Sequence, residues 1–119
     1  MKIQESAENY LETIYVLSQK NDSVRSIDIA NELGFSKPSV SVAMKNLREK
    51  NLIEMDKEGF IKLLDSGKEI AKKVYERHTI LTDCLVKLGV SREVAVEDAC
   101  KIEHIISDET FNAIKNLIK

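Results

Sequence analysis

The sequence is poor in the residues that build turns, sheets and disulfide frameworks. It has no tryptophan, one proline and four glycines, and aromatic residues make up only 5% of its 119 positions. This composition favours helices over a β-sandwich or barrel, whose strands are rich in aromatic residues and whose turns need glycine and proline. A chain of this length can bury one modest core, which excludes two large domains. We therefore expect a mainly α-helical protein.

Long apolar segments are absent as well. The N-terminus, Met1 to Glu5, lacks the apolar core of a secretory signal, and no apolar run approaches the length that crosses a bilayer. The two cysteines, Cys84 and Cys100, are expected to stay reduced in such a chain. The sequence thus predicts a soluble, cytoplasmic protein without membrane contact, in which Cys84 is a packing residue.

The net charge of -2 gives little sign of a nucleic-acid binder, but the charges are unevenly distributed. Between Lys37 and Lys50 there are four basic residues and one acidic residue, whereas between Asp83 and Glu109 seven acidic residues outnumber three basic ones. A basic segment therefore precedes an acidic segment that can attract cations.

The spacing of apolar residues predicts two helices at the start of the chain. Apolar residues recur at steps of three and four from Ala7 to Leu17, which indicates an amphipathic helix over residues 5–19. Ser26 can cap a second, short helix, and Gly34 stands where a left-handed residue would end it.

A third helix is expected to begin at Ser36, which can act as its cap. Pro38 is tolerated in the first turn because the N–H groups there have no intrahelical partner. The apolar stripe of this helix consists of Val40, Ala43, Met44 and Leu47. A short helix, a tight turn with glycine and a capped third helix are typical of a helix-turn-helix, with the third helix in the recognition position.

Beyond Asn51 the pattern changes to two short strands, over residues 52–56 and 60–64, joined by a charged turn that contains Gly59. A hairpin directly after a helix-turn-helix is typical of a winged-helix domain. We assign this domain to residues 1–64.

The second part of the chain, residues 65–119, is expected to be helical. Ser66 and Glu69 form a possible capping box for a long helix that ends before Gly89. Its apolar residues repeat like a heptad, a seam suited to packing on another helix or a symmetry mate, and His78 interrupts this seam. We expect Ser91 to cap a helix that ends near Ile106, and a last helix to begin at Ser107.

Cys100, Glu103 and His104 stand at positions i, i+3 and i+4, so one continuous helix would place them on one face, within reach of a single ion. Thiolate, carboxylate and imidazole are all metal ligands. Taken alone, such a triplet is more often a small apolar residue beside solvated ones. The other histidine, His78, needs a partner if it is buried in its seam, and a metal would supply one.

Oxygen ligands from a further element are available in the first helix, where Glu8, Asn9 and Glu12 lie close together. Such a cluster is usually a solvated face. The sequence thus indicates a metal site built from three expected helices. Of its candidates, only those in the second part of the chain suggest a metal site by themselves.

Several segments resemble the diphtheria toxin repressor family of metal-dependent repressors. Asp98 to His104, followed by Ser107 to Glu109, is similar to the metal-site helix of that family. Residues 9–15, residues 36–41 and the pair Arg77-His78 match its first-helix, recognition-helix and dimer-helix motifs. The resemblance covers nearly the whole chain.

The resemblance implies a homodimer in which Fe²⁺ or Mn²⁺ acts as co-repressor for a palindromic operator, with control of metal-uptake genes as the usual output. It makes residues 65–119 a dimerisation and metal-binding domain. The ligand candidates that it implies are Asn9, Glu12, His78, Cys100, Glu103 and His104. Asn9 departs from the family, which commonly has methionine or aspartate at that position.

The metal is not settled by these residues. Cys100 is the iron-type residue of the family, whereas manganese-responsive members stop after the dimerisation helices, as this sequence does. A thiolate favours softer ions, and affinity across the divalent metals does not by itself reveal the biological one. We place Fe²⁺ slightly ahead of Mn²⁺.

DNA contacts are predicted at the start of the third helix, along its basic side and at the wing. Short polar side chains can approach bases or phosphates, and basic ones bind phosphates. The candidates are Ser36, Lys37, Pro38, Ser39, Ser41, Lys45, Arg48 and Lys57. For the three last-named basic residues the alternative is simple solubility.

Three other functions compete with a repressor. A winged-helix redox sensor would use Cys100, activated by His104, for oxidation instead of metal binding. A metal-dependent hydrolase is disfavoured because neither a nucleophile elbow nor an HExxH motif is present, so we expect no enzyme. A winged helix that only contacts proteins is the third alternative.

Overall fold

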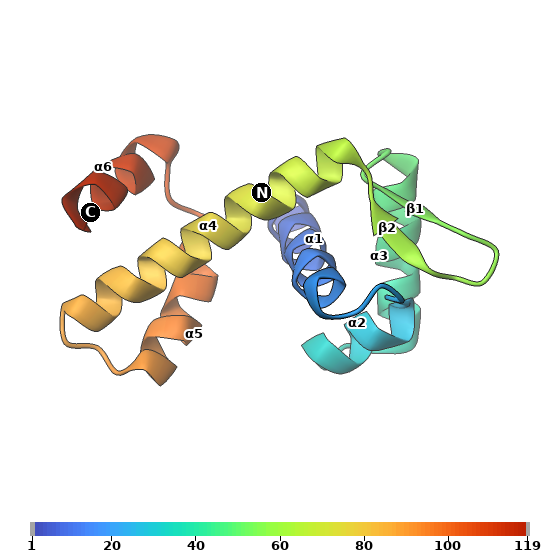
Figure 1. Cartoon of the computed structure of the whole chain (residues 1–119), viewed down its shortest axis with the longest axis horizontal. Helices are drawn as coiled ribbons and strands as arrows, with labels where there is room; N and C mark the ends of the chain where they lie inside the picture. Colours follow the sequence, from blue (N-terminus) through green and yellow to red (C-terminus); the bar gives the residue numbers. More distant parts are fainter. Residues whose placement is uncertain (1, 119) are drawn as a thin grey trace. The chain divides into compact units, whose positions relative to one another are not determined.

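The computed structural model describes the backbone of residues 2–118 and the side chains of residues 6–118. Helices dominate, as expected, and a single hairpin follows the third helix (Figure 1). The elements are α1 (Lys2–Lys20), α2 (Ser26–Leu33), α3 (Lys37–Glu49), β1 (Ile53–Met55), β2 (Ile61–Leu63), α4 (Asp65–Lys87), α5 (Arg92–Ile102) and α6 (Asp108–Ile118). Within this described part, none of the helices is long and apolar enough to span a bilayer.

The chain divides into two compact units, residues 1–72 and residues 73–119. The division falls inside α4, because Ala71 near its start is fully buried in the core of the first unit. The functional boundary that the sequence places between residues 64 and 65 stays a prediction.

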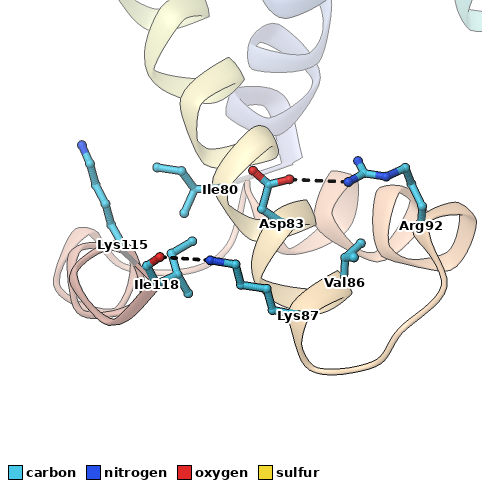
Figure 2. A pocket seen from close by; sticks show the side chains of 7 residues that line it. All are labelled: Ile80, Asp83, Val86, Lys87, Arg92, Lys115 and Ile118. Carbon is cyan, nitrogen blue, oxygen red and sulfur yellow. Dashed lines mark hydrogen bonds and ion pairs between the residues drawn. The ribbon is translucent and has the colours of Figure 1, made fainter.

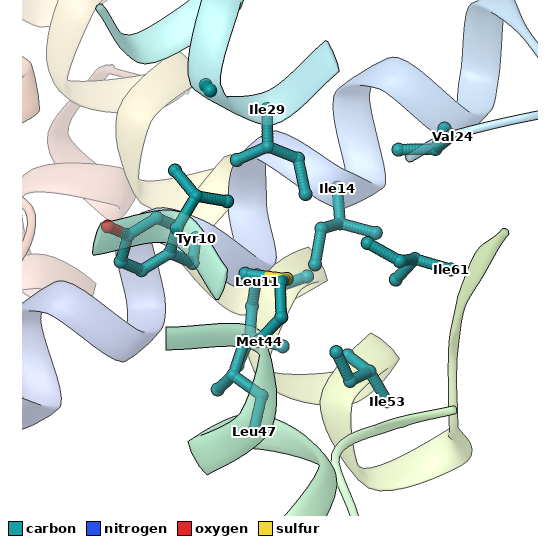
Figure 3. Packing of buried hydrophobic residues seen from close by; sticks show 12 residues of the cluster. Tyr10, Leu11, Ile14, Val24, Ile29, Met44, Leu47, Ile53 and Ile61 are labelled. Atoms are coloured by element: carbon teal, nitrogen blue, oxygen red, sulfur yellow. The ribbon is translucent and has the colours of Figure 1, made fainter. Parts of the chain in front are cut away.

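The core of the first unit joins all of its elements (Figure 3). Leu11 and Ile14 of α1, Ile29 of α2, Met44 of α3 and Ile61 of β2 are each 2% exposed or less. Burial of one such side chain contributes about 1.5 to 3 kcal/mol to folding. The apolar periodicity of the sequence therefore identifies the faces that pack.

The helix-turn-helix has the expected turn and one shifted cap. Gly34 has a left-handed φ of 71°, and the hydroxyl of Ser36 accepts a hydrogen bond from Ser39 N at 3.3 Å. The prediction of Ser26 as the cap of α2 is wrong by one residue. Arg25 occupies that position, and its N–H donates to the carboxylate of Asp28 at 2.9 Å, which is the hydrogen bond that the acidic residue makes in a capping box.

The wing is a two-stranded antiparallel hairpin in which Glu54 pairs with Lys62. Its turn is closed by Asp56, whose carboxylate accepts hydrogen bonds from the N–H groups of Glu58 and Phe60 at 3.0 and 2.9 Å. Ile61 N also donates to the carbonyl of Val24 at 2.7 Å, which ties the second strand to the segment before α2.

The start of α4 is built differently from the predicted capping box. The helix begins at Asp65, so Ser66 lies inside it, and the Ser66 hydroxyl donates to the carbonyl of Asn51 at 2.9 Å instead. Gly67 is needed in this turn because a Cβ there would collide with the carbonyl oxygen of Leu52. These contacts fasten the first turn of α4 against the chain that enters the wing.

The second unit consists of the rest of α4 with α5 and α6. Gly89, with a φ of 107°, follows the end of α4, and Ser91 caps α5 as expected. Ser107, expected as the first residue of the last helix, precedes α6, and its hydroxyl accepts a hydrogen bond from Thr110 N at 3.1 Å. The prediction that the middle helix reaches Ile106 is wrong, since α5 ends at Ile102 and residues 103–106 form a turn. The reason lies in contacts made by α4, described below.

Candidate metal centre and nucleic-acid interface

The second unit contains a carboxylate that is almost completely buried. Glu103 is 1% exposed, and within the described residues neither of its side-chain oxygens accepts a hydrogen bond. Imidazole nitrogens lie beside both oxygens. His78 Nδ1 is 3.4 Å from Oε2, and His104 Nε2 is 3.5 Å from Oε1.

This arrangement suits a cation. A carboxylate taken out of water is destabilising unless positive charge or hydrogen bonds compensate for its lost hydration. Two ligand atoms, each about 2.1 Å from one ion, stand roughly 3 to 3.5 Å apart. Each of the two nitrogen–oxygen separations at Glu103 is of this size, so the carboxylate and either neighbouring imidazole have the spacing of two ligands of one divalent metal.

Two elements bring these ligand atoms together. His78 lies in the middle of α4, between Val74 and Leu81, which are each 3% exposed. Glu103 is the C-terminal cap of α5, and His104 follows it in the turn. The side chain of His104 is only 3% exposed, and that of His78 is 24% exposed.

Cys100 lies in the last turn of α5 and is exposed. The sequence predicts one continuous helix through Cys100, Glu103 and His104. The structure differs, because α5 ends at Ile102 and the last two residues lie beyond it. The structure therefore places one imidazole nitrogen beside each oxygen of Glu103, with the His104 side chain buried and that of His78 partly exposed, and ligation by Cys100 stays a prediction. Cys84, expected to be a packing residue, is half-buried on α4.

The first-helix candidates, Asn9 and Glu12, belong to the other unit. Both are half-buried on α1 and stand three residues apart, a spacing that places them on neighbouring positions of one helix face. The backbone carbonyl of Asn9 accepts a hydrogen bond from Thr13 Oγ1 at 2.9 Å, as is common in helices. Their part in ligation stays a prediction.

Sequence reasoning missed a residue beside this cluster. Arg77 is 8% exposed and donates to the carbonyl oxygens of Glu103 and Ile106, at 3.1 and 2.9 Å. It also forms an ion pair with Asp108. The sequence singles out Arg77 only as part of a motif, although a basic residue beside the apolar seam of a helix is a signal that it needs a buried partner.

Asp108 is the acidic partner of two α4 residues. A hydrogen bond and the charge of Lys73, followed by a hydrogen bond from Arg77, hold the pKa of Asp108 below its ordinary value. Lys73 Nζ lies 3.2 Å from the carboxylate. The start of α6 is thus bound to α4 by charge as well as by packing.

The predicted DNA-binding residues are all exposed on the first unit. They are Ser36, Lys37, Pro38, Ser39, Ser41, Lys45 and Arg48 on or next to α3, and Lys57 in the turn of the wing. The Ser36 hydroxyl is already engaged, because it accepts from Ser39 N and donates to Ser39 Oγ at 2.9 Å. Ser36 therefore serves as the cap of α3 and also engages the Ser39 hydroxyl, while the side chains of the other candidates are exposed to solvent.

The cavity shown in Figure 2 is a separate feature of the second unit, with a volume of about 330 Å³. Among its lining residues, Arg92 lies 3.8 Å from Asp83, and Lys87 donates to the carbonyl of Ile118 at 3.2 Å. Asp83 is the only carboxylate among the lining residues. The lining is cationic and apolar, so its chemistry differs from that of the Glu103 cluster.

Two family models match the chain, one over its first part and one over its second part. The model described as an iron dependent repressor, N-terminal DNA binding domain, matches residues 2–61. The model described as an iron dependent repressor, metal binding and dimerisation domain, matches residues 64–119.

Curated proteins are similar over nearly the whole chain. The chain is 37% identical over 111 residues to the transcriptional regulator MntR of Escherichia coli O6:H1, covering 93% of this chain and 72% of that protein. It is 31% identical over 114 residues to the HTH-type transcriptional regulator MntR of Bacillus subtilis, covering 96% and 80%.

Solved structures share the fold. The manganese regulator SloR is matched with a TM-score of 0.84 at 27% identity, covering 94% of this chain and 53% of that one. A structure described as a manganese-dependent transcriptional repressor complex with manganese gives a TM-score of 0.86 at 28% identity, covering 92% and 51%. The chain thus spans about half the length of these solved structures.

Proposed function

Because the chain belongs to the iron-dependent repressor family of metal-dependent transcriptional repressors, we propose that it binds a palindromic operator as a homodimer when a divalent metal is bound. Genes for metal uptake are the proposed targets. The observation that carries the proposal is the buried carboxylate of Glu103 with an imidazole nitrogen beside each oxygen.

We propose that His78, Glu103 and His104 hold the metal from the second unit, together with Cys100. Glu12 and Asn9 of α1 are the proposed ligands from the first unit. The metal supplies positive charge that offsets the buried carboxylate. Asn9 contributes a neutral amide oxygen in place of a charged or thioether ligand, so we expect its contribution to metal affinity to be small.

The choice of metal rests on two opposing observations. Relatives are named as manganese regulators, whereas Cys100 offers a thiolate, which favours softer ions. We retain Fe²⁺ slightly ahead of Mn²⁺ as the proposed co-repressor. Because a repressor must reach its operator, the proposed compartment is the cytoplasm.

The proposed mechanism is allosteric coupling between two sites. The proposed ligands on α1 belong to the first unit, and those on α4, on α5 and in the turn after α5 belong to the second unit. A metal that binds both sets restrains the two units, and by linkage the operator then raises metal affinity by the same factor. Family membership gives no support to the alternative of a redox sensor that uses Cys100.

Operator binding with and without metal tests the proposal. We expect a gel shift with excess Fe²⁺ under anaerobic conditions or with Mn²⁺, and a large loss of affinity when a chelator is added. His104→Ala and Cys100→Ala should remove the metal-dependent part only, while Cys84→Ala serves as the matched cysteine control. Equal operator affinity with metal and with chelator would contradict the proposal.

A further inference from the structure

The guanidinium of Arg77 reaches from α4 into the turn that carries Glu103. Its Nη1 donates to the carbonyl oxygens of both Glu103 and Ile106, and its Nη2 contacts the carboxylate of Asp108. The guanidinium carbon also lies 5.3 Å from the centre of the Phe111 ring. One buried side chain therefore contacts the beginning and the end of residues 103–106 and the first turns of α6.

The two carbonyl groups need these donors. Carbonyls at the end of a helix and in the turn that follows have no intrahelical N–H partner, and burial without a partner is destabilising. Arginine suits the position because its planar fork offers several N–H groups in fixed directions, whereas lysine offers a single charged point. The turn after Ile102 thus depends on a side chain from another helix.

This contact has a consequence for the proposed metal site. The residue whose backbone carbonyl Arg77 holds is Glu103, the buried carboxylate, and the residue next to Arg77 on α4 is His78. The backbone of α4 thereby sets the position of one imidazole directly and that of the carboxylate through the guanidinium. Metal affinity is sensitive to such partners of the ligands, whose loss typically weakens binding by about ten- to a hundredfold.

We propose that Arg77 is a positioning residue of the metal site. By binding the backbone of the turn, it fixes the position of the Glu103 carboxylate relative to the imidazole of His78. This inference rests on the proposed function. It assigns to Arg77 a role in metal affinity and ligand geometry that is separate from its contribution to the docking of α6.

The test compares Arg77→Lys with Lys115→Met. Lysine keeps the positive charge near Asp108 but cannot bind both carbonyls in the manner of the fork. Lys115→Met removes the neighbouring ion pair between α6 and α4, Lys115 with Glu76 at 2.7 Å, and leaves residues 103–106 untouched. Three quantities are measured for each protein: Mn²⁺ affinity by competition with a chelating dye, the visible spectrum of the Co²⁺ complex, and the melting temperature without metal.

For Arg77→Lys we expect Mn²⁺ affinity to fall by about tenfold or more, and the Co²⁺ spectrum to change. Lys115→Met should keep the affinity and the spectrum of the unchanged protein even where its melting temperature falls. As a milder variant that retains Arg77, Asp108→Asn removes the negative charge that pairs with the guanidinium and should weaken Mn²⁺ binding severalfold.

Other outcomes separate the inference from the proposed function. If the unchanged protein binds neither Mn²⁺ nor Co²⁺, the proposed function fails and the inference fails with it. If it binds both, but Arg77→Lys and Asp108→Asn keep its affinity and spectrum, only the role of Arg77 is overturned. The same conclusion follows if Lys115→Met weakens Mn²⁺ binding as much as Arg77→Lys does.

Discussion

Gly67 allows the start of α4 to pack closely against the segment that enters the wing, because it has no side chain. It is buried in the first turns of α4, where a Cβ would collide with the carbonyl oxygen of Leu52. The Leu52 carbonyl also accepts a hydrogen bond from Leu64 N at 3.0 Å, so it cannot move away without breaking that bond. The hydrogen bond between the two ends of the wing therefore keeps the Leu52 carbonyl beside Gly67.

We predict that Gly67→Ala destabilises the protein by about 1 to 3 kcal/mol, because an added methyl group in a packed site forces the backbone to shift. The change in unfolding free energy is measured by urea denaturation. Lys68→Ala, at the exposed neighbouring position, should change it by no more than about 0.5 kcal/mol. Equal stability of Gly67→Ala and the unchanged protein would show that the wing and α4 do not pack this closely in solution.

At the scale of elements, α3 combines a structural and a functional face. Val40, Met44 and Leu47 are buried in the core, while Lys37 and Arg48 lie near opposite ends of the helix and are exposed. A helix that presents basic residues at both ends can contact phosphates on either side of a groove while its capped start approaches the bases.

If α3 is the recognition helix, neutralising its basic residues must alter the salt dependence of operator binding. Each phosphate contact releases counterions, so Lys37→Ala and Arg48→Ala should each reduce the slope of log K against log salt by about 1. Lys20→Ala, at the exposed end of α1, is the control and should leave the slope unchanged. Unchanged slopes for all three variants would mean that the two α3 residues serve solubility alone.

At the scale of the whole molecule, exposed apolar side chains in the second unit point to association. Large apolar residues that are exposed in this single chain include Leu88, Val94, Val96, Ile105 and Leu117, with exposed fractions between 39% and 82%. Such residues in a unit that matches a dimerisation domain are the candidates for the subunit interface. Homodimer formation would remove part of this surface from water.

We predict that Val94→Glu weakens the homodimer, raising its dissociation constant by about tenfold or more, because a charge would have to be buried in the interface. The variant should fold, since glutamate three residues after the Ser91 cap favours the start of a helix. Val42→Glu, at an exposed position of α3, is the matched control and should leave the dimer intact. Sedimentation equilibrium measures both, and an unchanged dissociation constant for Val94→Glu would exclude Val94 from the interface.

The features that could be predicted from the sequence are those set by local interactions. The caps at Ser36 and Ser91 and the left-handed turn at Gly34 were predicted correctly, because a cap or a turn depends on residues a few positions apart. The capping box at Ser66 was wrong because the Ser66 hydroxyl binds a carbonyl fifteen residues away. No local pattern contains that partner.

The sequence by itself determined a capped helix-turn-helix with a wing, a helical second part, and the types of side chain available for a metal. Only the tertiary structure decided that α5 ends at Ile102 and that Glu103 is buried with His78 and His104 at its two oxygens. It also decided that Arg77 binds the backbone of the turn at residues 103–106. Caps and periodicity act over one or two turns of a helix. The Arg77 and Glu103 contact spans 26 residues, so it arises only when α4 and the turn after α5 fold together.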